Sequence, residues 1–331
     1  MKKKFLIIGS NSFTGSNFIN YCLKKSHKII GISRSSEVQD FHLAYKDNPK
    51  SKKNFIFFKL NLNKDLNKII KLIKQTQPSH VVNFASQSMV AQSWISPVDW
   101  YQTNIISSVN LIEHIKNCKF IKKYVHISTP EVYGTTKINM SENNNYNPTT
   151  PYAISRACFD THLMQVYKHT GFPVVFTRAA NVYGPGQQLY RIIPRSIFSC
   201  FTNKKLKLDG GGSSKRSFIY IDDVVSATYK IAIKGKNGEI YHISNSKLIS
   251  IIDLVKKIFK ICKSNFNEKV IIGQERKGKD KVYSLNSRKL RQELKWKINV
   301  NLEKGIKKTL DWFLKNQKNL VRQKIYYKHK K

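Results

Sequence analysis

The chain has 331 residues, and its 59 Lys and Arg residues outnumber its 20 Asp and Glu residues, which gives a formal net charge of +39 at pH 7. Its 40% hydrophobic and 11% aromatic residues are ordinary for a globular protein and exclude a fibrous or disordered chain. Five scattered cysteines, none in C-x-x-C spacing, indicate neither a disulfide framework nor a metal site.

The high charge by itself would favour nucleic acid or a membrane surface as a partner, since a basic face attracts polyanions. However, 49 of the 59 basic residues are Lys spread along the whole chain, and the sequence has no zinc finger, RNA-recognition motif or basic zipper. A coding bias toward AT-rich codons accounts for such a composition. Nucleic acid is therefore not expected as a partner.

The N-terminus resembles a signal peptide only briefly. The apolar run Phe5–Ile8 follows three lysines and ends at Gly9, whereas a signal-peptide core has roughly 7–15 apolar residues. No stretch approaches the roughly 18 apolar residues that a membrane-spanning helix needs. We therefore expect a cytoplasmic protein with no membrane contact.

Short apolar runs alternate with amphipathic stretches over the first 180 residues. Residues 66–75 and 109–117 have helical periodicity. Buried strands are predicted at Phe5–Ile8, Lys28–Ile32, Phe55–Leu60, Val81–Phe84, Tyr124–Ile127 and Val174–Arg178. This alternation is typical of βαβ units, so the predicted fold class is α/β, with a Rossmann-type doubly wound parallel sheet and a smaller C-terminal α/β part.

The pattern loosens after about Tyr183, where glycine-rich turns separate shorter elements. We expect residues 1–182 to form a dinucleotide-binding domain, to which residues 222–248 return. Residues 183–221 and 249–331 are expected to form a second, smaller domain. The charged tail from Lys315 is expected to fray.

A glycine-containing loop follows the first predicted strand and precedes a helical pattern. Gly9 and Gly15 hold the outer positions of G-x-x-G-x-x-G, and Ser12 holds the middle one. Glycine lets the backbone turn sharply and approach a pyrophosphate at a helix N-terminus. This context predicts a dinucleotide site, with a plain strand–turn–helix as the alternative. Its expected residues are Gly9, Asn11, Ser12, Phe13, Thr14 and Gly15.

The end of the second strand discriminates between cofactors. NAD sites usually place an acid here against the ribose 2′-hydroxyl, but Arg34 and Ser35 occupy the position and the first acid is Glu37. A guanidinium can bind a phosphate with two hydrogen bonds. We therefore favour NADP over NAD, unless Arg34 is a surface residue or stacks on the adenine.

A candidate catalytic pair lies on the helix that begins near Pro151. Tyr152 and Arg156 are four residues apart and so face the same way. A nearby cation lowers the pKa of a phenol from about 10, which makes it a usable base. The predicted fifth strand ends at Ser128-Thr129, whose hydroxyls can share the proton.

Several motifs follow one another along nearly the whole chain: the glycine loop, residues 83–88 (NFASQS), 128–134 (STPEVYG), Pro151-Tyr152, 178–185 (RAANVYGP) and 216–224 (RSFIYIDDV). In these motifs the chain resembles the extended short-chain dehydrogenases that act on nucleotide sugars. The motif S-T-x-E-V-Y-G is most similar to that of the 4,6-dehydratases for dTDP-glucose and GDP-mannose.

The resemblance implies a redox cycle on an NDP-sugar. Tyr152 would take the proton of the sugar 4-hydroxyl, Thr129 would hydrogen-bond O4, and Glu131 would remove the C5 proton. Water would leave from C6, giving a 4-keto-6-deoxy sugar. Further implied cofactor residues are Asn61, Leu62, Ala85, Ser86, Gln87, Asn104, Tyr152 and Arg156. Implied substrate residues are Ser88, Thr129, Glu131, Asn181, Arg191, Arg216 and Arg276.

The resemblance also implies a homodimer or higher homo-oligomer, and it makes the smaller domain a nucleotide-sugar-binding one.

The sequence departs from the family's pattern at two positions. Arg156 replaces the family's lysine and keeps the charge but cannot lose a proton. Pro130 replaces the aspartate that protonates the departing hydroxyl in dTDP-glucose enzymes. An NDP-sugar C4-epimerase therefore stays open as an alternative, as does, more distantly, a non-catalytic nucleotide-binding or nucleic-acid-associated module.

Overall fold

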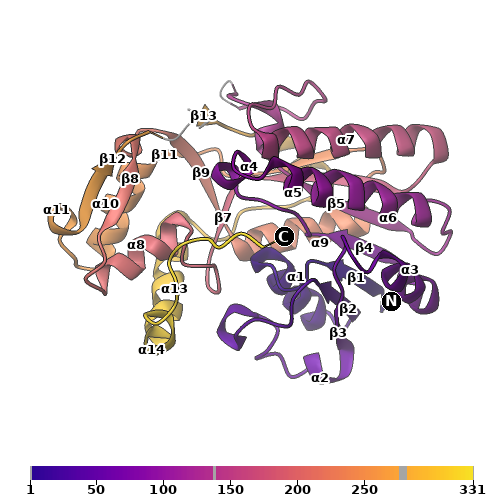
Figure 1. Cartoon of the computed structure of the whole chain (residues 1–331), viewed down its shortest axis with the longest axis horizontal. Coiled ribbons are helices and arrows are strands. Elements are labelled where there is room, and N and C mark those ends of the chain that lie inside the picture. Colours follow the sequence, from indigo (N-terminus) through magenta and orange to yellow (C-terminus); the bar gives the residue numbers. More distant parts are fainter. Residues whose placement is uncertain (1, 137–138, 276–281, 331) are drawn as a thin grey trace.

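The computed structural model describes residues 2–136, 139–275 and 282–330. Its centre is a seven-stranded parallel sheet with the strand order β10-β6-β5-β4-β1-β2-β3 (Figure 1). The strands are β1 (Lys4–Ile8), β2 (Lys28–Ser33), β3 (Phe55–Lys59), β4 (His80–Asn83), β5 (Lys123–Ser128), β6 (Val174–Ala179) and β10 (Ile240–Ile243). The predicted α/β fold with a doubly wound parallel sheet is confirmed.

Strand β1 shows why the sheet is covered on both faces. Phe5, Leu6 and Ile7 are completely buried. Phe5 and Ile7 join one hydrophobic core with α1 (Phe13–Lys24) and α9 (Ile221–Lys234). Leu6 and Ile8 join a second core on the other face. Because side chains alternate along a strand, a run of apolar residues buries both faces of a parallel sheet.

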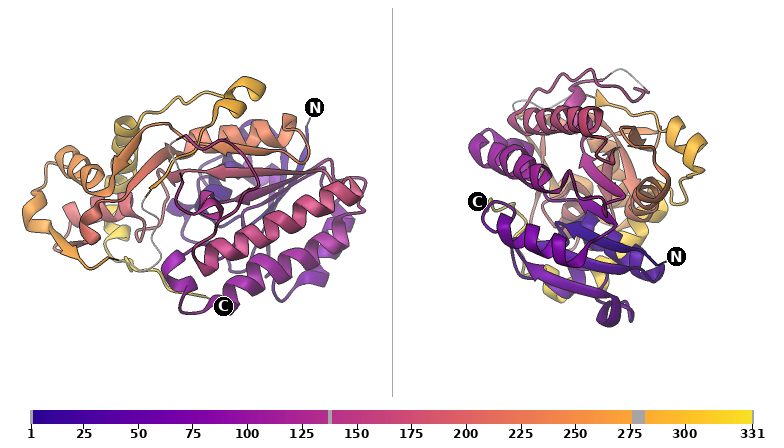
Figure 2. Two further views of the ribbon diagram at one scale, coloured as in Figure 1. Left: turned by 90° about the horizontal axis from the view of Figure 1, so that it is seen from above. Right: turned by 90° about the vertical axis from the view of Figure 1, so that its right-hand side faces the viewer.

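The second core packs three helices against the sheet, and Figure 2 shows two of them, α6 and α7, running side by side. These helices are α3 (Leu66–Thr76), α6 (Ser107–Ile115) and α7 (Pro151–Thr170). Shorter helical segments join them to the strands: α2 (Ser51–Asn54), α4 (Val90–Ser93), α5 (Pro97–Tyr101), a π-helical turn at Gln102–Ile106, and 3₁₀ turns at Asp40–His42 and Pro130–Tyr133. No helix in the described part of the chain is long and apolar enough to cross a membrane.

A smaller group of elements lies beyond the carboxyl ends of the large sheet. It contains a four-stranded sheet and a two-stranded sheet. Their strands are β7 (Asn181–Tyr183), β9 (Lys215–Tyr220), β11 (Leu248–Ser250) and β13 (Val282–Tyr283), and β8 (Leu206–Asp209) and β12 (Val270–Gly273). The helices are α8 (Ile192–Cys200), α10 (Ile251–Ile261), α11 (Phe266–Lys269) and α13 (Leu302–Lys315), with a 3₁₀ turn at Gly210–Gly212. Helix α12 (Arg288–Leu294) instead packs against α9 and β10 of the large sheet. Between β9 and β11 the chain returns to the large sheet as α9 and β10.

The expectation that the tail frays from Lys315 is wrong. The chain forms α14 (Gln317–Leu320) and then residues 321–330 run back across the molecule toward α1 and α4 (Figures 1 and 2). Leu320 and Ile325 are buried in the first core, and apolar anchors of this kind order a charged terminus.

Candidate active site

A cleft of about 660 Å³ opens where the carboxyl ends of the large sheet face the smaller group of elements. Parallel α/β sheets bind ligands at this edge, because loops from several strands converge there. Among the residues expected in the site, the cleft is lined by Ser12, Phe13, Thr14, Arg34, Ser86, Gln87, Ser88, Thr129, Glu131, Tyr152, Asn181, Arg191 and Arg216.

The loop after β1 forms a cradle that only glycine fits. Gly9 has φ +83°, and a Cβ there would lie 2.7 Å from the backbone nitrogen of Ala85. A Cβ on Gly15 would lie 2.5 Å from the carbonyl oxygen of Gly9. The middle position is Ser12 because its hydroxyl caps α1, accepting a 3.0 Å hydrogen bond from the Gly15 nitrogen. The cradle therefore presents the N-terminus of α1 to the cleft, as a pyrophosphate requires.

Asn11 ties this loop to the loop after β2. Its side-chain nitrogen donates to the carbonyl oxygens of Ser35 at 3.0 Å and Ser36 at 2.9 Å, and its side-chain oxygen is buried without a hydrogen-bond partner. These bonds hold the loops after β1 and β2 together at the edge of the cleft. The glycine cradle before the N-terminus of α1 fits the pyrophosphate of a dinucleotide.

Gln87 and Arg34 enter the cleft from the ends of β4 and β2. Asn104 fixes the Gln87 backbone, since its side chain accepts from the Gln87 nitrogen at 2.9 Å and donates to the Gln87 oxygen at 3.0 Å. Both Gln87 and Arg34 donate side-chain hydrogen bonds to the carbonyl oxygen of Lys330. The C-terminal segment therefore reaches the part of the cleft expected to hold the cofactor.

The candidate catalytic side chains gather where β5 ends and α7 begins. Thr129 precedes the short 3₁₀ turn that carries Pro130 and Glu131, and its hydroxyl accepts from the Glu131 nitrogen at 3.3 Å. Tyr152 is in the first turn of α7, which Thr150 caps. Burial raises the pKa of Tyr152, the Glu131 charge raises it further, and Arg156 together with a hydrogen bond to Thr129 lowers it.

Arg156 does not line the cleft. Its guanidinium is buried against β5, where it donates to the carbonyl oxygen of Ile127 and lies 3.1 Å from Nε2 of His126. Its charge lowers the pKa of Tyr152. The structure therefore brings Arg156 close enough to act on Tyr152 electrostatically, while its described hydrogen bonds go to the sheet.

Arg178, the first residue of the R-A-A-N-V-Y-G-P segment, does not line the cleft. Arg178 is completely buried below the cleft and donates a 2.8 Å bond to Asp160 of α7. The same carboxylate accepts a 2.6 Å bond from Ser128, and its other oxygen lies 3.0 Å from Nε2 of His126. A buried guanidinium needs such a partner, and this pair joins β6 to α7 directly behind the catalytic residues.

On the substrate side, Arg191 lies 3.5 Å from the Ser88 hydroxyl and Arg216 donates to the Lys215 carbonyl oxygen at 2.8 Å. Arg276 lies outside the described residues. The expected residues that do not line the cleft are Gly9, Asn11, Gly15, Ser35, Asn61, Leu62, Ala85, Asn104 and Arg156. Lining residues that the sequence analysis missed include Gln187, Gln188, Tyr190, Arg195, Lys207 and Tyr327.

Four of the missed residues immediately follow the R-A-A-N-V-Y-G-P segment, so their position could have indicated them; Lys207 and Tyr327 carry no local signal. Within the described ranges, no group of three or more His, Cys, Asp or Glu side chains could hold a metal ion. The chemistry of the cleft therefore rests on phenol, hydroxyl, carboxylate, amide and guanidinium groups.

Comparison with known proteins decides the family. The family model described as GDP-mannose 4,6 dehydratase matches residues 6–309. The chain belongs to the GDP-mannose 4,6-dehydratase family. Membership makes it an extended short-chain dehydrogenase of the nucleotide-sugar 4,6-dehydratase type, a lyase.

Relatives of this dehydratase align over nearly their full length. The dTDP-glucose 4,6-dehydratase of Haemophilus influenzae is 30% identical over 94% of this chain and 98% of its own. The dTDP-glucose 4,6-dehydratase 1 of Escherichia coli is 30% identical over 95% of this chain and 94% of its own. Both relatives thus include the sheet and the smaller group of elements.

Solved structures agree. The Bacillus anthracis dTDP-glucose 4,6-dehydratase in complex with NAD has a TM-score of 0.85 at 28% identity, covering 96% of this chain and 98% of its own. The Streptomyces venezuelae dTDP-glucose 4,6-dehydratase with NAD bound has a TM-score of 0.88 at 25% identity, covering 95% and 98%. A Thermotoga maritima UDP-glucose 4-epimerase, with a TM-score of 0.85 at 24% identity over 95% of this chain and 99% of its own, shares the fold.

Proposed function

We propose that this dehydratase oxidises C4 of a nucleoside-diphosphate hexose, eliminates water across C5 and C6, and releases a 4-keto-6-deoxy sugar. One observation carries the proposal: Thr129, Glu131 and Tyr152 line the same cleft as residues 12–14 of the loop that forms the glycine cradle. A nicotinamide dinucleotide bound there would accept hydride from C4 and return it to C6.

In this proposal Tyr152 removes the proton of the 4-hydroxyl, and Thr129 hydrogen-bonds the same oxygen. The Glu131 carboxylate, in the 3₁₀ turn that follows Thr129, removes the proton of C5 once C4 is a ketone. Asn181 of β7, Arg216 of β9 and Arg191 just before α8 also line the cleft, and we propose that they and Arg276 hold the diphosphate.

Pro130 sets the chemistry of the elimination apart from that of dTDP-glucose enzymes. It is buried, lines the cleft and has no group that could protonate the departing C6 hydroxyl. We propose that Glu131, protonated by its abstraction of the C5 proton, delivers that proton to the C6 oxygen. The same proline favours the second candidate, a C4-epimerase, in which no hydroxyl departs and no acid is needed.

For the cofactor, the cradle fits NAD and NADP equally, since both carry the pyrophosphate. The finer preference for NADP rests on Arg34, an exposed cation in the cleft at the end of β2. If a 2′-phosphate contacts it, Arg34→Ala should weaken NADP binding by about tenfold and leave NAD binding nearly unchanged. Equal losses for both cofactors would contradict the preference.

We also propose that the chain forms a homodimer through the outer face of α4 to α7. Apolar side chains are exposed there, including Ile95 at 79% and Val98 at 73% exposure, with Trp94, Ile106 and Ile154 beside them. Burying such a patch stabilises association. Val98→Asp combined with Ile106→Asp should give a monomer in light scattering, whereas an unchanged mass would contradict this interface.

The two-domain division and the cytoplasmic location remain predictions.

The deciding experiment is a product assay. Purified protein with NAD or NADP and a panel of nucleotide hexoses should yield a product with a new C6 methyl signal by NMR. A C4-inverted product that keeps its C6 oxygen would instead establish the epimerase. Glu131→Gln should abolish the methyl product and leave partial reduction of the cofactor, because C4 oxidation does not need that carboxylate.

A further inference from the structure

The C-terminal segment, residues 321–330, is held in the cleft by contacts along its length. Ile325 is buried in the first core, and the side-chain oxygen of Gln323 accepts a 3.2 Å hydrogen bond from Nε2 of His42. Tyr327 packs edge to face on Tyr190, with ring centres 5.4 Å apart. His329 lies 2.7 Å from a carboxylate oxygen of Asp99 and stacks on Trp100 at 4.9 Å.

The end of the segment accepts hydrogen bonds from two side chains that are expected to bind the cofactor. The carbonyl oxygen of Lys330 accepts from Arg34 at 2.9 Å and from the buried Gln87 amide at 2.8 Å. The Tyr327 hydroxyl lies 3.4 Å from the other Gln87 amide atom, the oxygen. Both polar atoms of the Gln87 side chain are therefore engaged by the C-terminal segment.

The order of the strands relates the Lys330 carbonyl oxygen to the loop after β1. Arg34 follows β2 and Gln87 follows β4, and β1 is the strand between them. The carbonyl oxygen that accepts from both side chains therefore joins the loops on either side of the loop after β1, which is the glycine cradle. A dinucleotide that crosses from the β2 side to the β4 side passes over the same loop with its pyrophosphate. In the left view of Figure 2 the yellow C-terminal segment ends next to the purple helices of the N-terminal half.

We propose that the C-terminal segment is a displaceable occupant of the dinucleotide site, in which the Lys330 carbonyl oxygen takes the place of a phosphate or ribose oxygen until the dinucleotide replaces it. The inference rests on the proposed function, because it needs a dinucleotide in this cleft. Only the fraction of molecules with a released segment is competent to bind, so the segment raises the apparent dissociation constant.

Two variants separate the effect of the segment's contacts from the effect of its lysine charges. A chain that ends at Tyr326 retains Ile325 but loses Tyr327, His329 and the Lys330 carbonyl. Because this truncation also removes lysines, His329→Ala provides a variant with all of them present and the Asp99 and Trp100 contacts removed. Lys324→Ala, an exposed residue of the same segment, is the matched control.

Titration with NADH and NADPH, followed by fluorescence, should show about tenfold tighter binding by the truncated chain, a smaller gain for His329→Ala, and no change for Lys324→Ala. Hydrogen exchange of the full chain should show that residues 326–330 lose protection when the dinucleotide is added.

Equal affinities for the full and truncated chains, or weaker binding by the truncated one, would overturn the inference and leave the proposed function standing. Greater protection of residues 326–330 in the complex would overturn it as well, since the segment would then cover the cofactor rather than give way to it. If neither chain bound any dinucleotide, the inference and the proposed function would fail together.

Discussion

Pro130 is the residue whose replacement tests the elimination most directly. In the proposed mechanism Glu131 must both take the C5 proton and deliver it to the departing hydroxyl. A separate general acid should make the second of these steps faster. Pro130→Asp places a carboxyl group on the lining of the cleft, at the start of a 3₁₀ turn where an acid is well tolerated. We expect dehydration to be accelerated at least tenfold, since a positioned general acid contributes roughly 10²–10⁴-fold.

Pro130→Asn is the matched control, because it has the same shape as aspartate and no proton to give. Steady-state formation of the 4-keto product measures all three proteins. Equal rates for the Asp and Asn variants would show that the proton comes from elsewhere and that Pro130 does not limit the rate of dehydration.

Arg156 governs the pH dependence through Tyr152. Its charge lowers the pKa of the phenol, which burial and Glu131 raise above the ordinary value. If the phenolate is the base, as proposed, activity rises with pH toward that pKa. Arg156→Gln removes the stabilising charge and should move this rising limb of cofactor reduction up by about one pH unit, while Arg156→Lys should leave it in place.

Arg291→Gln, at an exposed position of α12, is the control for loss of one positive charge. A full pH profile of kcat/KM distinguishes this role from a purely structural one, which would lower the rate at every pH. An unshifted profile for Arg156→Gln would rule out the electrostatic role.

At the residue scale, sequence reasoning succeeded where a side chain follows a strand, since the ends of parallel strands meet at one edge. Ser12, Gln87 and Thr129, which follow β1, β4 and β5, are examples. Strand alternation also indicates that Arg178 is buried, because it shares a face of β6 with the buried Phe176. The bond between Arg34 and Lys330 joins residues 296 apart, and no local pattern encodes such a contact.

At the scale of elements, buried histidines make the large sheet sensitive to acid. Burial lowers the pKa of His80 and His126 to about 4, and that of His242 to about 3. Each stays neutral in the folded chain, whereas an unfolded histidine binds a proton near pH 6.5. The unfolded state therefore binds more protons between about pH 6.5 and 4, and stability that is complete above this window is lost as the pH falls through it.

We expect the melting temperature to fall by roughly 10 °C between pH 7 and pH 4.5, because each of these histidines contributes on the order of 3 kcal/mol. Calorimetry across this range measures the slope. His80→Gln should flatten it, and His114→Gln, at an exposed position of α6, should not. A slope that is the same in His80→Gln as in the parent would contradict this account.

The elements themselves were largely predictable. The six predicted strands agree with β1 to β6 to within one residue at every end, because continuous apolar runs are typical of strands buried on both faces. The C-terminal segment was mispredicted, since its lysines indicate exposure while the two apolar residues that order it, Leu320 and Ile325, are too sparse to form a pattern.

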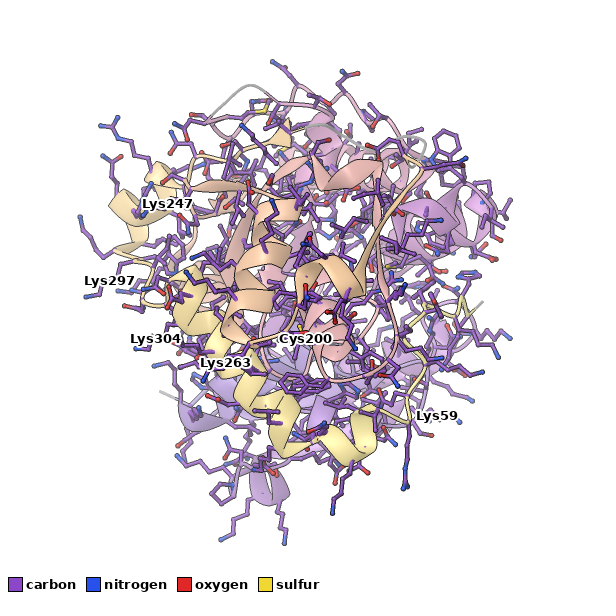
Figure 3. All side chains as sticks on the ribbon, turned by 90° about the vertical axis from the view of Figure 1, so that its left-hand side faces the viewer. Lys59, Cys200, Lys247, Lys263, Lys297 and Lys304 are labelled. Atoms are coloured by element: carbon purple, nitrogen blue, oxygen red, sulfur yellow. The ribbon has the colours of Figure 1, made fainter. Side chains whose placement is uncertain are left out.

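For the whole molecule, the charge of +39 is spread rather than concentrated. Figure 3 shows lysines projecting from one face, among them the exposed Lys247, Lys263, Lys297 and Lys304. With only 20 acidic residues to offset 59 basic ones, mutual repulsion opposes the compact state. Salt screens this repulsion, since the Debye length falls from about 30 Å at 0.01 M to about 8 Å at 0.15 M.

We therefore expect the melting temperature to rise by about 5 °C between 10 mM and 300 mM NaCl. Changing Lys247, Lys263, Lys297 and Lys304 to Glu lowers the net charge by 8, from +39 to +31, and should raise stability at 10 mM salt and reduce the response to salt. Changing the same four to Gln lowers it by 4 and should give half the effect, which separates charge from the loss of lysine itself. A melting temperature that falls with salt would mean that attractive ion pairs, rather than repulsion among the lysines, dominate the surface electrostatics.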